Sequence, residues 1–292
     1  MTTQSTDTTV VVSGAAVLLP GADTVRALAE GPAAGGAPVE PAEHVGRKGL
    51  RYKDRATQLG YCLTAAALKD AGLLGDDGLT CAPESVGVVA SSNFGNLDTV
   101  ARALDTIREE TVTATSPMDL PNASSNVIAS SAAIRYGLRG PNLMVCNGET
   151  SGLDAVHWAT TMIAAGRAER VLVLGVEPDN DVVRKLLGGT RAVDGGAALV
   201  LESRPAAERR SATVRAVLGP YTRSAGTPVP GSARRWELPE HLGRASGAHG
   251  VLQCAAAVGW FDAGERGPVH AVAGTAADDA SAGLLLMAPE AA

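Results

Sequence analysis

The residues with the most chemical potential lie where a strand is expected to pass into a helix. The apolar run Asn142–Cys146 predicts a strand that is covered on both faces. Asn147 and the glycine after it predict a turn, with Asn147 as the N-cap of a helix that runs from Thr150 to the stop at Gly166. Glu149 then stands at the helix start, where backbone N–H groups converge and the helix dipole favours negative charge. Such a position suits an ionised nucleophile such as cysteine. In this chain the residue is a carboxylate.

Two roles are open for Glu149. Backbone N–H bonds would hold its carboxylate in the charged form, which is a poor acylation nucleophile, so one interpretation is a charged helix cap. The other is a weak general base. His157 and His249 each fall in an apolar helical pattern and are interpreted as core or interface residues. Cys146 is expected to point into the sheet as a packing residue.

Composition restricts the class of protein. The chain has 292 residues, of which 45% are hydrophobic and 19% are charged, so it is expected to be globular. The net charge of −6 and the absence of a basic, aromatic-interleaved stretch argue against nucleic-acid binding. The 4 cysteines are far apart with no metal-ligand spacing, so neither a metal site nor a cofactor is predicted. No run is long enough for a membrane span and no signal peptide is evident, which predicts a cytoplasmic protein.

The surrounding elements alternate between strands and helices as far as Glu202. This alternation predicts an α/β fold with a mainly parallel sheet. The expected strands are 10–13, 86–90, 142–146, 170–176 and 197–201, and the expected helices are 54–72, 97–107 and 150–166; the stretch 31–43 is expected to be a loop. A shorter echo follows, with strand 212–218, helix 247–261 and strands 269–273 and 283–287, and residues 219–239 are expected to be an irregular polar connector. The chain is therefore divided into a first half, residues 1–205, and a truncated second half, residues 206–292.

Four stretches together resemble the thiolase superfamily, specifically the β-ketoacyl synthases of fatty-acid and polyketide assembly. They are residues 46–56, 117–126, 140–156 and 195–202. The resemblance implies a thiolase-like fold of two stacked βαβαβαββ halves, here with the C-terminal half shortened. It also implies a dimer whose acyl tunnel runs along the interface.

A ketosynthase uses a cysteine nucleophile and two histidines. Placed on this sequence by the resemblance, the nucleophile position is Glu149, and the second histidine, in a Gly-His-x-x-Gly-Ala pattern, falls on Arg244. The first histidine has no counterpart, because the connector 219–239 replaces the segment that should hold it. The resemblance thus implies no catalytic residue in this chain. It places these residues at the acyl tunnel or the dimer interface: Met118, Leu120, Asn122, Ser125, Asn147 and Glu149.

Within the family, such a chain is most similar to the chain-length factor of type II polyketide synthases, and its shortened second half to those of highly reducing, polyene-forming systems. The implied partner is a ketosynthase subunit with an intact Cys-His-His site, through which an acyl carrier protein is mainly engaged. Two alternatives stay open. One is a malonyl-carrier-protein decarboxylase or acyl hydrolase that uses Glu149, and the other is a stand-alone acyl-binding pseudoenzyme.

Overall fold

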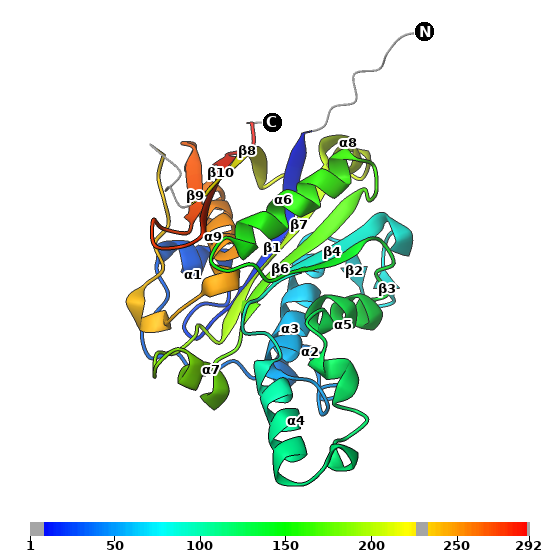
Figure 1. The fold of residues 1–292 in the computed structure, drawn as a ribbon. Helices are drawn as coiled ribbons and strands as arrows, with labels where there is room; N and C mark the ends of the chain where they lie inside the picture. Colours follow the sequence, from blue (N-terminus) through cyan, green and yellow to red (C-terminus); the bar gives the residue numbers. More distant parts are fainter. Residues whose placement is uncertain (1–8, 226–232, 291–292) are drawn as a thin grey trace.

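A computed structural model describes residues 9–225 and 233–290 of the chain (Figure 1). Its centre is an eight-stranded sheet in the order β5-β4-β6-β7-β1-β8-β10-β9. The strands of this sheet are β1 (Val10–Leu18), β4 (Val86–Ser91), β5 (Asn142–Val145), β6 (Arg170–Glu177), β7 (Gly195–Ser203), β8 (Ala216–Ala225), β9 (Val269–Ala273) and β10 (Ala280–Met287). A two-stranded ribbon is formed by β2 (Leu74–Gly75) and β3 (Gly78–Leu79).

Helices cover both faces of the first part of the sheet. They are α1 (Val25–Glu30), α2 (Pro41–Val45), α3 (Arg55–Asp70), α4 (Leu97–Glu109), α5 (Val127–Tyr136), α6 (Ser151–Ala164), α7 (Asp181–Leu186), α8 (Arg204–Arg209) and α9 (His249–Asp262). Alternate residues of β6 belong to separate cores: Val171 and Val173 pack with α6 and α9, whereas Leu172 and Leu174 pack with α3 and α5. Figure 1 accordingly shows α6 and α3 on opposite sides of the strands. The predicted strands and helices are confirmed, with ends that differ by several residues.

The prediction of a mainly parallel sheet is wrong. Only β4 runs parallel to its neighbours β5 and β6; the pairs β6–β7, β7–β1, β1–β8, β8–β10 and β10–β9 are antiparallel. Helical crossovers make β4, β5 and β6 parallel, but the later strands reverse direction one after another. The expectation that strand 142–146 is covered on both faces is also wrong. β5 is an edge strand, and its first residue Asn142 is exposed while Val145 is buried.

The second half repeats part of the first. β8, β10 and β9 are neighbours in the same antiparallel order as β1, β7 and β6, and α9 precedes β9 as α6 precedes β6. The halves join where Val11 and Val12 of β1 pair with β8. β8 begins later than predicted and continues through Ala225, so the first residues of the expected irregular connector are strand. Residues 226–232 of that connector lie outside the described part of the chain. The predicted division between residues 205 and 206 falls inside α8.

The free edge of β9 is closed by neighbouring groups. The backbone N–H of His270 donates to the carbonyl oxygen of Arg234 at 2.8 Å. The next outward N–H, that of Val272, donates to the side-chain oxygen of Gln253 at 2.8 Å, and the Gln253 amide donates to the carbonyl of Trp236 at 3.2 Å. An unpaired buried N–H costs about 1–3 kcal/mol. The buried Gln253 avoids this cost by accepting the hydrogen bond that a further strand would otherwise accept.

Helices α6 and α9 cross at closest approach through two glycines. A Cβ on Gly152 would lie 2.9 Å from the Gly250 nitrogen, and a Cβ on Gly250 would lie 2.6 Å from the Leu153 nitrogen. Only glycine fits both positions, because real Cβ atoms do not approach backbone atoms so closely. The crossing holds the starts of the two helices side by side.

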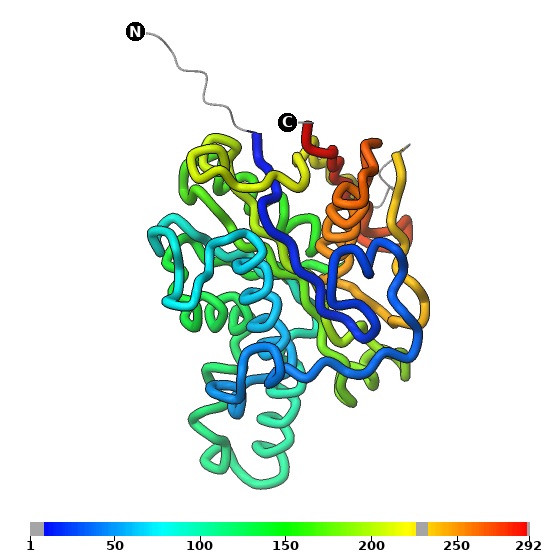
Figure 2. The backbone as a smooth tube through the Cα atoms, turned by 180° about the vertical axis from the view of Figure 1, so that it is seen from behind, coloured from blue at the N-terminus to red at the C-terminus, as the bar shows by residue number. Residues whose placement is uncertain are grey.

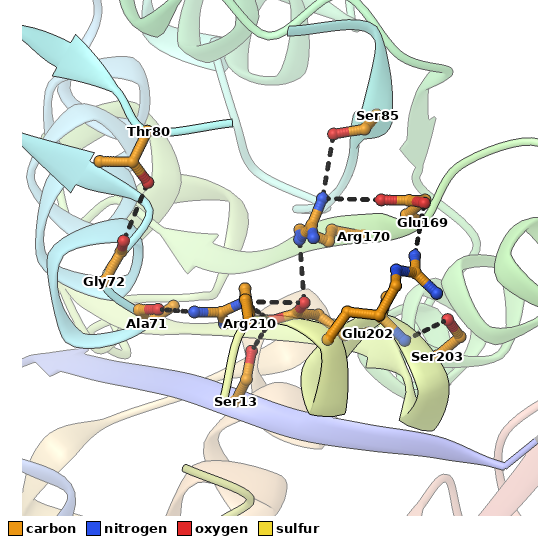
Figure 3. Close-up of polar contacts among 12 residues, drawn as sticks. Ser13, Ala71, Gly72, Thr80, Ser85, Glu169, Arg170, Glu202, Ser203 and Arg210 are labelled. Atoms are coloured by element: carbon orange, nitrogen blue, oxygen red, sulfur yellow. Dashed lines mark hydrogen bonds and ion pairs between the residues drawn. The ribbon is translucent and has the colours of Figure 1, made fainter. Parts of the chain in front are cut away.

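A buried ionic cluster fastens the segment that joins the halves (Figure 3). The carboxylate of Glu202 on β7 accepts hydrogen bonds from Arg170 on β6, from Arg210 after α8 and from Ser13 on β1. Burial alone would raise the pKa of Glu202, but the arginines and the serine outweigh it and lower that pKa. Two strands and the end of α8 are thereby tied to one side chain.

One part of the chain projects from the body of the molecule. Figures 1 and 2 show α4 and the segment after it extending away from the sheet. Among the residues of α4 only Thr99 is buried. We call residues 97–123 the arm; its exposed apolar side chains are Leu104, Ile107, Val112, Met118 and Leu120.

Candidate functional site

The turn between β5 and α6 differs in detail from the prediction. Thr150, not Asn147, is the N-cap residue of α6, so Glu149 precedes the helix. Asn147 instead braces the first turn of α6, since its amide donates to the Asp154 carboxylate at 2.6 Å and its carbonyl oxygen accepts from Ser151 at 2.7 Å. Gly148 takes a φ of 85°, which the tight turn requires. Glu149 therefore lies in the turn before α6 and not within the helix.

Glu149 forms an ion pair with Arg244. An Arg244 guanidinium nitrogen lies 2.6 Å from a Glu149 carboxylate oxygen, and the two side chains are 53% and 23% exposed, respectively. Within the described residues no backbone N–H donates to this carboxylate, so the predicted helix-cap role is wrong. Because the pair is partly exposed, its contribution to stability is small. Its chemical effect is to neutralise the charge of Glu149.

The backbone of Arg244 is hydrogen-bonded to the segment just before β7. Gly243 before it has a φ of 84°, and a Cβ there would lie 2.3 Å from the carbonyl oxygen of Arg191. The Arg244 N–H donates to that same oxygen at 2.8 Å, and the Arg244 carbonyl accepts from Val193 at 3.1 Å. The arginine is thus presented to Glu149 by a rigid segment.

Asn93, in the loop after β4, fills the space beside Glu149. Its amide nitrogen donates to the Gly148 carbonyl and to the Ser246 hydroxyl, both at 2.8 Å. Its amide oxygen accepts from Ser151 at 3.1 Å and from the Gly148 N–H at 3.3 Å. One side chain thereby bridges the turn before α6 and the turn before α9.

Glu177 accepts hydrogen bonds from the same loop. Its fully buried carboxylate accepts from the backbone N–H groups of Asn93 at 2.7 Å, Phe94 at 3.0 Å and Gly247 at 2.9 Å, and from the Ser92 hydroxyl at 2.8 Å. Burial raises the pKa of Glu177 to about 7, although each of these donors acts in the opposite direction. Glu177 is therefore a group of the site that titrates near neutral pH.

A cavity of about 470 Å³ opens beside the ion pair. Glu149, Arg244, His249 and Gln253 line it, together with Glu237 and the turn between β9 and β10. The Nε2 atom of His249 is buried and has no hydrogen-bond partner among the described residues. Burial lowers the pKa of His249 and so favours the neutral imidazole. The charge of Glu237 acts in the opposite direction but is the smaller effect. The cavity thus combines three carboxylates, two guanidinium groups and an imidazole that burial favours in its neutral form.

Other residues that the sequence singled out lie at separate, exposed places in the structure. Cys146 is exposed, so the prediction that it packs inside the sheet is wrong; β5 is an edge strand and leaves its end uncovered. His157 is exposed and stacks on Tyr221 at a centroid distance of 4.2 Å. Met118 and Leu120 are exposed on the arm, as is Ser125 just after it. None of these residues lines the cavity beside Glu149.

Asn122 is a buried residue of the arm. Its amide donates to the carbonyls of Tyr52 at 2.8 Å and Met118 at 2.9 Å, and its oxygen accepts from Lys53 at 3.0 Å. The side chain therefore anchors the arm to the loop before α3.

The sequence did not single out Asn93, Glu177 or Ser246. A signal was present, since Ser91-Ser92-Asn93 follows a buried strand, and the carboxyl ends of parallel strands are where α/β folds place their sites. Ser246 is buried and has a φ of 38°, an uncommon conformation for a residue other than glycine. Nothing in the sequence marks that conformation.

The described residues hold neither a metal cluster nor a membrane-spanning helix. No group of three or more histidine, cysteine or acidic side chains is arranged to hold a metal ion in residues 9–225 and 233–290. In the same ranges no helix is both long and apolar enough to cross a membrane.

Comparison with known proteins places this fold in one class. Residues 37–184 match the family model described as the N-terminal domain of β-ketoacyl synthase. The structure superposes on the ishigamide ketosynthase/chain length factor with a TM-score of 0.78 and 19% identity, covering 96% of this chain and 99% of that one. A type II polyketide synthase acyl-carrier protein in complex with its ketosynthase gives a TM-score of 0.78 at 15% identity, covering 96% of this chain and 99% of that one. The fold is thiolase-like α/β, as predicted.

Sequence relatives agree with this class. The chain is 32% identical over 136 residues to 3-oxoacyl-[acyl-carrier-protein] synthase 2 of Vibrio harveyi, which covers 46% of this chain and 32% of that protein. It is 32% identical over 215 residues to the granaticin polyketide putative β-ketoacyl synthase 1 of Streptomyces violaceoruber, covering 63% of this chain and 50% of the relative. The chain thus spans between a third and a half of the length of these relatives. It belongs to the β-ketoacyl synthase family.

Glu177 predicts a pH dependence of stability. Its pKa is raised from 4.5 to about 7 on folding, so in that window the folded protein binds more protons than the unfolded one. The free energy of unfolding should therefore fall as pH rises through the window, by at most ~1.4 kcal/mol per pH unit from this group. Urea unfolding at several pH values should show this slope in the wild type relative to Glu177→Gln. Exposed Glu208→Gln serves as the control and should keep the wild-type slope; equal slopes in all three proteins would contradict the assignment.

Proposed function

We propose that this chain is a non-catalytic ketosynthase-like subunit, a chain-length factor that pairs with a true ketosynthase in a type II polyketide synthase. It would complete the partner's acyl tunnel and limit chain length, in a highly reducing, polyene-forming system of the cytoplasm. An acyl carrier protein would be engaged mainly through the partner. Residues 1–205 and 206–292 would be the complete and the shortened half of one thiolase-like unit.

The Glu149–Arg244 ion pair carries this proposal. By family resemblance these residues occupy the positions of the cysteine nucleophile and the second histidine, and they lie 2.6 Å apart. A carboxylate paired with a guanidinium is a poor nucleophile, and a guanidinium is not a proton acceptor near neutral pH. The side-chain oxygen of Asn93 also accepts a hydrogen bond from the backbone N–H of Gly148, the residue before Glu149. The Glu149 carboxylate and the Asn93 amide therefore both have partners within the site.

Two surface features support a partner subunit. β5 is an edge strand whose outer side pairs with no other strand of the described residues. The arm exposes a run of large apolar side chains, a pattern typical of surfaces that a partner covers. The structural neighbours include a ketosynthase/chain length factor, which fits a heterodimer.

Within such a heterodimer, Met118 and Leu120 would reach the far end of the acyl tunnel. Both are apolar and exposed in a segment punctuated by proline. Asn122 would fix the position of this segment, since two of its hydrogen bonds, with Tyr52 and Lys53, hold the arm to the body of the chain and the third, to Met118, lies within the arm. Ser125, Asn147 and Glu149 would lie nearer the interface.

A second candidate is a malonyl-carrier-protein decarboxylase or hydrolase, because His249 lines the same cavity as Glu149 and is favoured in its neutral form. Arg244 opposes it by neutralising the carboxylate. A third candidate is a stand-alone acyl-binding pseudoenzyme. Acylation and pairing assays separate the three.

Restoring the nucleophile alone should not restore acylation. Glu149→Cys still lacks both histidines and keeps Asn93 in the site, so we expect neither the wild type nor this variant to take up an acyl group from acyl-carrier protein. Intact-mass spectrometry reads the adduct directly. An acyl adduct or malonyl decarboxylation by the wild-type chain, lost in Glu149→Ala, would instead establish the second candidate.

Pairing is the most direct test of the function. Co-expressed with a ketosynthase encoded beside it, the chain should co-purify as a heterodimer on size-exclusion chromatography. Leu120→Asp should weaken pairing at least about tenfold, because a charge would be buried in the interface. Leu186→Asp is the matched control, since Leu120 and Leu186 are 69% and 63% exposed. A monodisperse monomer that does not bind the ketosynthase would point to the third candidate.

Met118 should influence product length. In the reconstituted pair, Met118→Ala enlarges the tunnel end and should lengthen carrier-bound chains by one or more two-carbon units, whereas Met118→Trp should shorten them. Mass spectrometry of the carrier-bound chains measures both. An unchanged length distribution in both variants, with pairing intact, would remove Met118 from the tunnel.

A further inference from the structure

A second cavity of about 500 Å³ lies between α2, α3 and α5. These helices pack together on the face of the sheet opposite α6 and α9 (Figure 1). The cavity is separate from the ion-pair site, and no residue lines both. We call it the basic groove.

Apart from Tyr136, all the charged or titratable side chains that line the basic groove are basic. Lys48 and Lys69 line it with Arg135 and His44, and no carboxylate does. Two acidic residues are neighbours in sequence of the lining residues. Asp70, next to Lys69, is paired with Arg215, and Glu43, next to His44, does not line the groove. This concentration of positive charge occurs in a chain with a net charge of −6. Like charges gathered without counter-charges repel, and an anion relieves that repulsion.

Arg135 is held in place without being neutralised. Its two terminal guanidinium nitrogens donate to the carbonyls of Lys48 and Val45, both at 2.9 Å. The guanidinium also lies over the ring of Tyr61 at 4.7 Å from the centroid. Its described partners are neutral carbonyls and aromatic rings, whereas Arg170 is paired with a carboxylate. Its full positive charge is therefore available to the groove.

The groove leaves room next to this charge. Gly49 has a φ of 82°, and a Cβ there would lie 3.0 Å from a terminal nitrogen of Arg135. Any larger residue would cover the guanidinium. Tyr136, Val45 and Leu74 add an apolar wall to the cavity.

We propose that the basic groove is a binding site for a phosphate ester. Guanidinium and ammonium groups are the side chains that proteins use for phosphate, and an arginine already fixed by carbonyl oxygens loses little entropy on binding. The apolar wall accommodates the part of the ligand that carries the phosphate, and the volume suits a small molecule. The site requires no partner subunit, so its test is independent of the proposed pairing.

The test measures binding of named phosphates to the whole chain, or to the heterodimer if the chain requires it. ADP and 4′-phosphopantetheine, which are phosphate esters, are titrated by calorimetry at low salt beside inorganic pyrophosphate, which is not an ester. The tighter of the two esters identifies the source of the phosphate, and pyrophosphate binding more tightly than both would overturn the assignment of an ester. The double variant Lys48→Ala/Lys69→Ala should bind at least about tenfold more weakly, and added salt should weaken binding in the wild type. Lysines are replaced because Arg135 also fastens the loop after α2.

The matched control is Lys185→Ala on α7, outside the groove, which should bind like the wild type. Unchanged melting temperatures establish that the variants are folded. Absence of saturable binding, or equal binding in the double variant and the wild type, would overturn the proposal. So would binding of an acidic carrier protein through these lysines when all three small phosphates fail.

Discussion

The arrangement of the site depends on the close crossing of α6 and α9. Gly152 and Gly250 bring the two backbones to a distance at which no side chain fits between them. Because the helices cross near their starts, the turn that carries Glu149 and the turn that carries Arg244 face one another. Glu177 secures this geometry by accepting from the loop after β4 and from Gly247 before α9. A wider crossing would separate the ion pair and empty the space that Asn93 fills.

Charge pairing divides the molecule into three kinds of region. In the interior, Glu202 and Asp194 are matched by arginines, so their burial is compensated. In the turn before α6, the Glu149–Arg244 pair is too exposed to add much stability, yet it places a guanidinium against the carboxylate. In the basic groove the positive charges have no carboxylate among the described lining residues. Of these three regions, only the basic groove has positive charge that an anionic ligand could neutralise.

In the part of the chain after residue 205, the free edge of the sheet is protected. Three strands and one long helix remain among its described residues, and Gln253 satisfies the N–H of Val272 that would otherwise be unpaired at the edge of β9. The other edge of the sheet has no such device, since β5 presents its outer side without a described neighbouring strand. The two edges of the sheet therefore differ in how their outward backbone groups are satisfied.

The sequence alone determined the succession of strands and helices, the α/β class and the family, because hydrophobic periodicity and the motifs around Glu149 are local. The resemblance to that family is also the basis for proposing that Glu149 takes the place of the nucleophile. Tertiary structure decided the rest. The edge position of β5, the antiparallel majority of the sheet and the exposure of Cys146 follow from strand order, which no single segment encodes. The pairing of Glu149 with Arg244 depends on residues 95 positions apart that meet only across a helix crossing. The roles of Asn93 and Glu177 likewise arise from hydrogen bonds between distant loops, and periodicity carries no information about such contacts.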